Sequence, residues 1–250
     1  MRDASILAVR QLTKSFGALR ATDGIDFDVR EGETHAIIGP NGAGKTTFIG
    51  QLAGNLRPDG GRIVFGGEDI TRLAAPRRAR KGLARSFQIT SIYPEFSALA
   101  NVALAVQAHA GHSFRFWGDA RRDRSLMEPA KKILEDVGLG ARASELAANL
   151  SHGEQRQLEV AMALATRPRL LLLDEPMAGM GAEESQRMIG FLGTLRQRYT
   201  IVLVEHDMDA VFRLADRISV LVYGRLIATG APEEIRANPE VRTAYLGEDA

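Results

Sequence analysis

The stretch of sequence that decides the fold is Gly39-Pro40-Asn41-Gly42-Ala43-Gly44-Lys45-Thr46. It fits the pattern of a glycine, any four residues and then Gly-Lys-Ser/Thr, in which the backbone N–H groups of a glycine-rich loop point inward at an anion. An apolar run at 36–38 precedes the loop as a buried strand, and residues 47–49 continue it as a helix. The positive end of that helix faces the same place. The stretch therefore predicts a loop that binds the phosphates of a nucleotide.

Two side chains of this loop are expected to act on the phosphates directly. The ammonium of Lys45 would reach the β- and γ-phosphates, and the hydroxyl of Thr46 would ligate Mg²⁺. A chance match to four constrained positions occurs in about one chain in a hundred of this length. The strand before the loop and the helix after it lower that frequency further, so nucleotide binding is the preferred interpretation.

The second half of the predicted site follows a run of four leucines at 170–173. This run is typical of a buried strand, and Asp174 and Glu175 come directly after it. Ligands of open α/β sheets bind beyond the carboxyl ends of the strands, where these two acids fall. We expect Asp174 to hold Mg²⁺, directly or through water, and Glu175 to polarise the attacking water as general base. Alone, this stretch would fit any buried strand that reaches solvent, and the phosphate loop favours the functional interpretation.

The remaining pattern predicts an α/β protein. Period-two alternation at 25–29 and turn residues around 62–65 predict strands in the first part, and roughly 90–149 is typical of helices. From Leu170 onward, strands and helices alternate: strands at 170–173, 200–204 and 218–222, and helices from about Ala182 and Asp207. Such alternation predicts parallel strands joined by crossover helices, with the helical middle as an insertion.

Composition excludes several classes of protein. The chain has 250 residues, 45% of them hydrophobic and 25% charged, as in an ordinary globular protein. Its 32 Lys+Arg and 31 Asp+Glu leave a net charge of +1, so no general attraction to nucleic acid or anionic lipid is expected. Because the chain has no cysteine, a disulfide framework, thiol catalysis and a cysteine-based zinc site are excluded.

Neither a secretory leader nor a membrane span is expected. Asp3 stands where a leader would begin its apolar core. Residues 96–114 carry no charged side chain, but Ser97, Asn101, Gln107 and two histidines interrupt them. A spanning helix needs about 20 predominantly apolar residues, so this segment does not qualify.

The kind of nucleotide-binding protein is indicated by Leu150-Ser151-His152-Gly153-Glu154-Gln155. Ser151 and Glu154 have the spacing of a helix capping box, and a helix start also offers N–H groups to an anion. The stretch resembles Leu-Ser-Gly-Gly-Gln, the signature of the ATP-binding cassette (ABC) ATPases, with Ser151 and Gly153 kept and His152 and Glu154 departing from it. The resemblance implies that Ser151 and Gly153 touch a γ-phosphate bound by a second ATPase subunit, in a homodimer or a paralogous heterodimer.

Three further residues match the family's motifs in their order along the chain. Phe16 resembles the aromatic residue that stacks on adenine, Gln88 the glutamine that senses Mg²⁺ and the attacking water, and His206 the switch histidine that contacts the γ-phosphate. Taken singly, a core Phe, a solvated Gln and a capping His would explain them. Their places beside the two stronger motifs favour the functional interpretation. One departure is Gly181, which stands where the family often has an aspartate that communicates across the dimer interface.

The resemblance extends over nearly the whole chain. It implies a P-loop NTPase of class α/β, with a RecA-like parallel sheet core, an N-terminal antiparallel β subdomain and an inserted α-helical subdomain. A single ABC domain would cover residues 6–247, with the core and β subdomain at about 6–88 and 155–247 and the helical subdomain at about 89–154. The residues implied to bind ATP are Phe16, Gly39, Pro40, Asn41, Gly42, Ala43, Gly44, Lys45, Thr46, Thr47, Ser151 and Gly153. Those implied in catalysis are Glu175, His206 and Gln88, and those implied to hold Mg²⁺ are Thr46, Gln88 and Asp174.

The signature, the insert and the tail at 223–248 are similar to the branched-chain amino-acid importer branch of the family. This implies an ATP-hydrolysing subunit, peripheral on the cytoplasmic face of the inner membrane, with an integral membrane permease and, indirectly, a periplasmic substrate-binding protein as partners. Urea and short-amide importers and the lipopolysaccharide exporter share much of the pattern and stay as alternatives, as does a non-transport mechanical ATPase. A phosphate-loop GTPase would want an Asn-Lys-x-Asp motif, which the chain lacks, and a kinase would not need Ser151 and Gly153.

In the family, a cytoplasmic helix of the permease docks in a groove between the core and the helical subdomain. The corresponding residues here run from Gln88 to Phe96, and Ile89, Ile92 and Tyr93 are apolar residues of this stretch. Apolar residues clustered on a surface usually mark an interface. The alternative is that these side chains pack the insert against the core.

Overall fold

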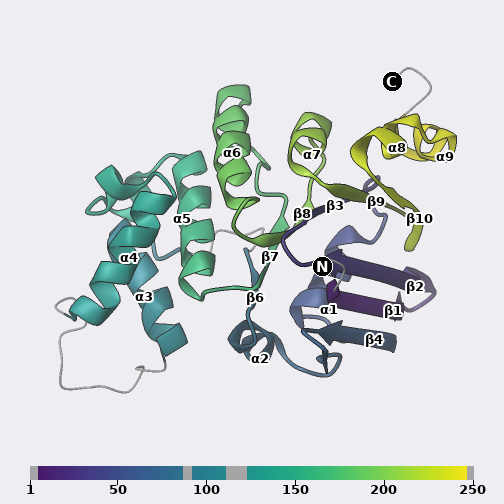
Figure 1. Cartoon of the computed structure of the whole chain (residues 1–250), viewed down its shortest axis with the longest axis horizontal. Helices are drawn as coiled ribbons and strands as arrows, with labels where there is room; N and C mark the ends of the chain where they lie inside the picture. The colour runs from purple at the N-terminus through teal and green to yellow at the C-terminus, as the bar shows by residue number, and fades with distance from the viewer. Residues whose placement is uncertain (1–4, 87–91, 111–122, 247–250) are drawn as a thin grey trace.

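The computed structural model describes residues 5–86, 92–110 and 123–246 (Figure 1). Gln88 and Ile89, for which the sequence predicts roles, lie outside these residues. The strands are β1 (Ser5–Phe16), β2 (Leu19–Arg30), β3 (Thr34–Ile38), β4 (Gly60–Phe65), β5 (Glu68–Asp69), β6 (Leu83–Arg85), β7 (Leu170–Asp174), β8 (Thr200–Val204), β9 (Arg217–Val222) and β10 (Arg225–Gly230). The helices are α1 (Lys45–Ala53), α2 (Ala75–Arg80), α3 (Ala98–Ala110), α4 (Arg124–Asp136), α5 (His152–Ala165), α6 (Ala182–Leu195), α7 (Met208–Leu214), α8 (Pro232–Ala237) and α9 (Pro239–Val241). Two short 3₁₀ helices are η2 (Gly140–Arg142) and η3 (Ala147–Asn149), and one π-helical segment is η4 (Arg242–Leu246).

The described strands form two sheets. The smaller is antiparallel, in the order β2-β1-β4-β5. The larger has the order β10-β9-β3-β8-β7-β6, and all its neighbours are parallel except β10 with β9. Because parallel strands end at the same edge, the residues that follow β3, β7 and β8 are brought together there.

Strand β7 is covered on both faces, which explains its uninterrupted leucines. Leu170 and Leu172 pack in the apolar cluster that contains β1, β2 and α1. Leu171 and Leu173 point to the opposite face and pack in the cluster that contains α5 and α6. The strand therefore holds the phosphate-binding half and the helical half of the molecule together.

Helix α1 lies between the two sheets, directly after the phosphate loop (Figure 1). Phe48, Ile49 and Leu52 are fully buried in the cluster that contains β1, β2 and β7. The helix ends at Gly54, whose φ of 83° is in the left-handed region that favours glycine at a helix end. Its packing fixes the position of the loop at its N-terminus.

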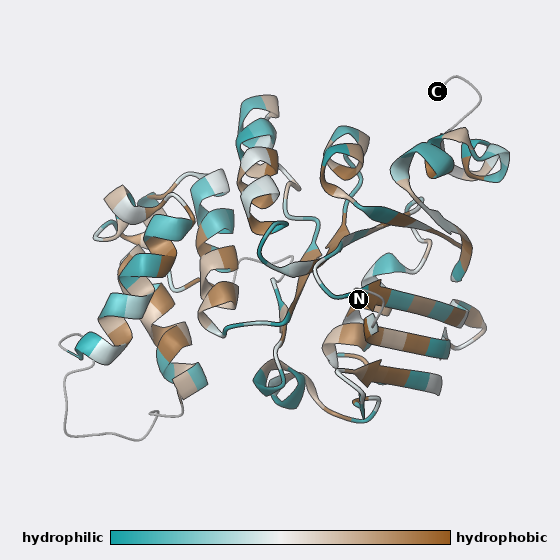
Figure 2. Cartoon of the chain, in the orientation of Figure 1, coloured by the Kyte–Doolittle hydropathy of each residue, from teal (hydrophilic) through white to brown (hydrophobic). Residues whose placement is uncertain are grey.

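Helices α3 and α4 lie between β6 and β7 in the chain and pack with α5 at one end of the molecule (Figure 1). Val102, Leu134 and Leu158, one from each helix, are buried together. Figure 2 shows hydrophilic residues along the outer side of α4, as expected for a surface helix. The limits predicted for the helical subdomain, about 89 and 154, stay a prediction, and the second limit lies within α5.

The arrangement confirms the predicted α/β class, with a parallel core, an N-terminal antiparallel sheet and inserted helices. The strands predicted from the sequence lie within β2, β3, β4, β7, β8 and β9, and the helices predicted after the phosphate loop and from about Ala182 and Asp207 are α1, α6 and α7. Asp207 is the N-cap of α7, and its carboxylate accepts the N–H of Ala210 at 3.2 Å. Over the described ranges, every helix is too short or too polar to cross a membrane.

Candidate functional site

The phosphate loop connects β3 to α1 at the carboxyl edge of the larger sheet. Gly42 and Gly44 have φ values of 80° and 103°, which non-glycine residues adopt with strain. A Cβ atom on Gly44 would also overlap the carbonyl oxygen of Ala21 on β2. The second and third glycines of the motif are therefore required by backbone conformation, and the third also by close packing against β2.

Lys45 begins α1 and its ammonium lies inside the loop. Its Nζ donates to the carbonyl oxygens of Gly39 at 2.7 Å and Pro40 at 3.0 Å. Burial lowers the pKa of Lys45, and the charges of Glu175 and Asp174 partly oppose this effect. The ammonium is thus close enough to both acids to interact with them, and Thr46, next in the chain, is exposed.

A contact that the sequence did not predict holds the loop from the other side. The backbone N–H of Gly224, in the turn between β9 and β10, donates to the carbonyl of Ala43 at 2.9 Å. The carbonyl of Gly224 accepts the N–H of Asp23 on β2 at 2.8 Å. The turn therefore joins the loop to the antiparallel sheet. The only sequence signal for such a contact is a glycine in a hairpin turn, which is too common to single out.

Asp174 ends β7 and is only 2% exposed. Arg85 ends β6, the neighbouring parallel strand, and its Nη2 lies 2.7 Å from Asp174 Oδ2. A carboxylate this deeply buried requires such a partner, because an unpaired buried charge is costly. Sequence reasoning missed Arg85, because 89 residues separate it from Asp174 in the chain.

Glu175 and His206 follow β7 and β8 and meet at the same edge. His206 Nε2 lies 2.7 Å from Glu175 Oε1. Glu175 has a φ of 48°, which is strained for a non-glycine residue, and its N–H donates to the carbonyl of Val204 at 2.9 Å. The residue predicted as general base and the predicted switch histidine are thus brought together.

Glu205 is a second residue that sequence reasoning missed. It is 3% exposed, and its carboxylate accepts the N–H groups of Met177 at 2.9 Å and His206 at 3.0 Å. Burial raises the pKa of Glu205, and these backbone N–H groups partly oppose the rise. The side chain therefore ties the loop after β7 to the loop after β8.

The signature residues begin α5. Ser151 Oγ accepts the N–H of Glu154 at 3.3 Å, and Glu154 Oε2 accepts the N–H of Ser151 at 2.8 Å, so the predicted capping box is confirmed. The bond from the Ser151 N–H lowers the pKa of Glu154, and Arg142, 3.0 Å away, acts in the same direction. Glu154 thus serves in the cap at the position where the family signature has glutamine, a residue that can make the same cap.

Ser151 and Gly153 line a polar hollow of about 450 Å³ together with residues of α6 such as Glu184 and Arg187. None of the described residues of the phosphate loop, 39–47, lines this hollow. Within one chain, the signature and the described residues of the loop therefore do not share this hollow.

Phe16, at the end of β1, is half exposed, and Lys14 Nζ lies 5.6 Å from the centre of its ring.

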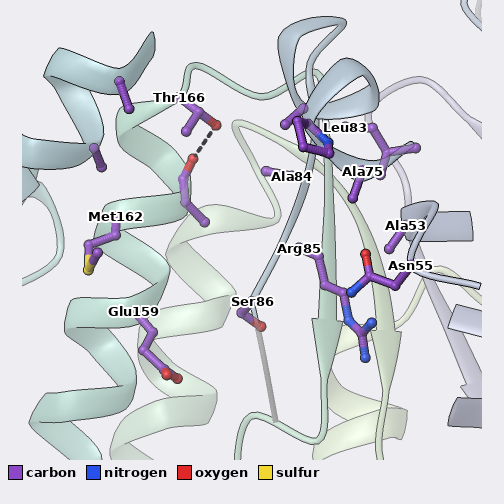
Figure 3. Close-up of a pocket in the computed structure, with 15 residues that line it drawn as sticks. Ala53, Asn55, Ala75, Leu83, Ala84, Arg85, Ser86, Glu159, Met162 and Thr166 are labelled. Carbon is purple, nitrogen blue, oxygen red and sulfur yellow. Dashed lines mark hydrogen bonds between the residues drawn. The ribbon is translucent and has the colours of Figure 1, made fainter. Parts of the chain in front are cut away.

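A groove of about 410 Å³ lies between the core and the inserted helices (Figure 3). Small apolar side chains form most of it: Ala53 of α1, Ala75 and Ala79 of α2, Ala105 and Ala108 of α3, and Met162 of α5. Arg85 and Ser86 line its base, and Figure 3 shows the Arg85 side chain extending toward Asn55, away from Met162.

The residues expected to dock a permease differ in their exposure to solvent. Ile92 packs against the apolar cluster of the inserted helices. Tyr93 and Phe96 are 54% and 41% exposed, and their rings stack with centres 5.5 Å apart. Phe96 lines a second hollow, between α3 and α4, and neither aromatic residue lines the groove beside Arg85.

Comparisons with known proteins agree with the geometry. The family model described as ABC transporter matches residues 22–178, and that described as branched-chain amino acid ATP-binding cassette transporter matches residues 225–250. The chain is 41% identical to the high-affinity branched-chain amino acid transport ATP-binding protein BraF of Pseudomonas aeruginosa, over 97% of this chain and 98% of BraF. It is 37% identical to LivG of Escherichia coli K12, which carries the same description, over 97% of this chain and 98% of LivG.

Two solved structures have the same fold. A nucleotide-free ATP-binding cassette from an ABC transporter superposes with a TM-score of 0.85 at 30% identity, and a cassette in its ADP conformation with 0.86 at 29%. Each comparison covers 98% of this chain and 100% of the other. The expected P-loop NTPase fold is confirmed. The chain therefore belongs to the ABC transporter family, as one of its nucleotide-binding ATPase chains.

Proposed function

We propose that this chain is the ATP-hydrolysing subunit that powers import of branched-chain amino acids through a separate permease. The observation that carries the proposal is the grouping of Lys45, Asp174, Glu175 and His206 at one edge of the parallel sheet. A loop that holds triphosphate there meets a carboxylate for the metal and a base for water. The similarity to BraF and LivG and the match at the C-terminus support branched-chain amino acids as the substrate class.

The residues present fit Mg²⁺. The Thr46 hydroxyl and the Asp174 carboxylate supply the hard oxygen ligands that this ion takes together with phosphate oxygens. Gln88 is proposed as a further ligand. When bound, Mg²⁺ neutralises negative charge that develops on the phosphates during transfer. The N–H groups of residues 39–47 and the Lys45 ammonium would bind the phosphates, and the exposed ring of Phe16 would stack on adenine.

Hydrolysis requires a base beside the γ-phosphate. Glu175 is proposed to accept the proton of the attacking water, and its contact with His206 Nε2 orients the carboxylate. His206 and Gln88 would then contact the γ-phosphate and the water. Glu205 supports the two loops that carry Glu175 and His206, and its burial there raises its pKa. In this proposal Glu205 itself does not touch the phosphates.

The second subunit completes each site. Ser151 and Gly153 lie in a hollow away from the phosphate loop of their own chain, which supports their contact with the nucleotide of a partner chain. The N–H groups in the first turn of a helix such as α5 suit an anion. We propose a homodimer or a paralogous heterodimer with two shared ATP sites.

The permease is proposed to dock in the groove beside Arg85. Its apolar walls come from both the core and the inserted helices, so a helix seated there would contact both parts. The chain would then be peripheral on the cytoplasmic face of the inner membrane, with a periplasmic substrate-binding protein as an indirect partner.

Uptake by whole cells tests the function. Deleting the gene should abolish uptake of labelled leucine, isoleucine and valine at low concentration, and the wild-type gene should restore it. A gene carrying Glu175→Gln should not restore uptake, because the protein is made but cannot turn over ATP. Unchanged leucine uptake together with lost uptake of urea or short amides would move the chain to a related importer.

A further inference from the structure

Arg85 is placed to act on the proposed metal site, although it belongs to none of the family motifs matched above. Its guanidinium lies 2.7 Å from Asp174 Oδ2, which is the range of a charge-assisted hydrogen bond. Asp174 is buried, with 2% of its side chain exposed, and Arg85 is mostly covered, with 13% exposed. The pair is therefore protected from the solvent screening that weakens surface ion pairs.

The two residues occupy equivalent ends of neighbouring strands. Arg85 pairs with Leu172 in the parallel register of β6 with β7, two residues before Asp174. Just beyond Arg85, the N–H of Ser86 donates to the carbonyl of Leu172 at 2.9 Å. The backbone of Arg85 is thus fixed relative to that of Asp174, and the guanidinium approaches the carboxylate from a rigid support.

A hydrogen bond to Oδ2 limits rotation of the carboxylate about its χ2 angle. Lys45 lies on the phosphate side and interacts electrostatically with the same carboxylate. Arg85 belongs to β6, the neighbour of β7 on the side away from β8 and β3. Asp174 is therefore held by a cation from the edge strand, and the ammonium of the phosphate loop is near enough for the charge of Asp174 to raise its pKa.

We propose that Arg85 is a positioning residue of the nucleotide site, which orients Asp174 for Mg²⁺ by fixing its Oδ2 oxygen. The inference rests on the proposed role of Asp174 as a metal ligand. Partners that orient metal ligands typically contribute roughly 10- to 100-fold to metal affinity. Arg85 itself touches neither nucleotide nor metal in this role.

The test measures nucleotide affinity of the full chain with and without metal. Arg85→Met removes the hydrogen bond and keeps an unbranched side chain in the same space. The Kd of ATP in EDTA should stay within about twofold of the wild type, whereas the gain in affinity on adding Mg²⁺ should shrink by roughly tenfold or more. Electron paramagnetic resonance of Mn²⁺ bound with ATP should show the same loss of metal affinity directly.

Arg85→Lys keeps the positive charge on a shorter side chain that can still donate a hydrogen bond. This variant should therefore recover part of the metal affinity. Arg62→Met is the matched control, because Arg62 is an exposed arginine of β4 that pairs with Asp69 of β5 at 2.8 Å. The control should change the Kd of ATP neither in EDTA nor with Mg²⁺. Thermal melting checks that each variant is folded.

Three results would overturn the inference: an unchanged effect of Mg²⁺, a tighter metal site, or an equal loss of affinity with and without metal. The second result would show that Arg85 acts only as a repelling charge, and the third that it serves the fold alone. A wild-type chain that binds no ATP under either condition would instead contradict the proposed function. The two failures are therefore distinguishable.

Discussion

His206 Nε2 lies 2.7 Å from Glu175 Oε1, although 31 residues separate the two in the chain. The preceding residue, Glu205, accepts the N–H of Met177 two residues beyond Glu175. The histidine and the proposed base are therefore joined both by their side chains and through the loops that carry them. A displacement of either loop would change where the Glu175 carboxylate points.

Glu175→Gln should lower the rate of ATP hydrolysis by a factor of roughly 10² to 10⁴, the usual contribution of a positioned base. The amide keeps the size of the side chain, so ATP should still bind and dimers should accumulate with ATP and Mg²⁺. Single-turnover phosphate release measures the rate, and size-exclusion chromatography with light scattering measures the dimer. Glu183→Gln, at an exposed acid in the first turn of α6, should leave both unchanged. Turnover near that of the wild type would reject Glu175 as the base.

Gly153→Asp should stop hydrolysis and leave ATP binding to the isolated chain nearly intact. A Cβ atom at Gly153 would lie 3.5 Å from Glu184 Oε1, an ordinary contact, so the fold should tolerate it. The added carboxylate would stand where the γ-phosphate of the partner site docks, and like charges repel there. Lys45→Ala, in contrast, should abolish phosphate binding.

Gly190→Asp is the matched control for that charge, because Gly190 is exposed on α6 with open space around its Cα atom. It should hydrolyse ATP as the wild type does, with a rate that rises faster than linearly with protein concentration. If Gly153→Asp weakened ATP binding as severely as Lys45→Ala, the signature would act within its own chain.

Stability should fall as the pH is lowered below about 6.5, the ordinary pKa of histidine. His35 is fully buried, and burial lowers its pKa, with Glu33 opposing the shift and Arg217 adding to it. Asp28, whose carbonyl lies 3.0 Å from His35 Nδ1, is the other ionisable neighbour. The unfolded chain takes up a proton below pH 6.5 that the folded chain resists, so the free energy of unfolding falls by up to about 1.4 kcal/mol per pH unit.

Urea unfolding between pH 7.5 and 5.5 measures this slope, and His35→Gln should flatten it by about one proton. His109→Gln, at an exposed position of α3, should keep the wild-type slope. Below that range, Glu33 and Asp28 add a further loss in the same direction. For each carboxylate, burial raises the pKa, but hydrogen bonds and positive neighbours outweigh this effect, so the net shift is downward. The contribution of these carboxylates to the free energy of unfolding is therefore lost as they become protonated. An equal slope in wild type and His35→Gln would refute the assignment.

The groove beside Arg85 and the hollow lined by Phe96 are two alternative docking sites, which variants can distinguish. Ala108→Glu places a charge in the apolar groove beside Arg85, at an exposed position of α3 where the fold should tolerate it. It should prevent co-purification with the permease and leave the basal ATPase rate within about threefold, a change of under ~1 kcal/mol in the barrier.

Gln107→Glu is the matched control on the neighbouring residue, because Gln107 lines the other hollow with Phe96. It should keep the permease, and so should Tyr93→Ala combined with Phe96→Ala. The reverse pattern, with loss in these variants and retention in Ala108→Glu, would place docking at the Phe96 hollow. Loss of basal activity in the double variant would show that the two stacked rings support the fold.

Much of the fold and the core of the site followed from the sequence, because the decisive signals are contiguous. The phosphate loop, the leucine run that ends in Asp174 and Glu175, and the capping box of Ser151 each combine backbone and side-chain requirements within a few residues. Most of these requirements are met by neighbouring residues of the chain, and the family resemblance ordered the motifs along the sequence.

The tertiary structure decided what those motifs contact. The sheet order places β6 and β8 on either side of β7, and this order brings Arg85 to Asp174 and Glu205 to the N–H of Met177. It also determined that Phe96 lines a hollow separate from the apolar groove. A sequence pattern specifies which face of an element is buried, whereas the partner across that face depends on how the whole sheet is assembled.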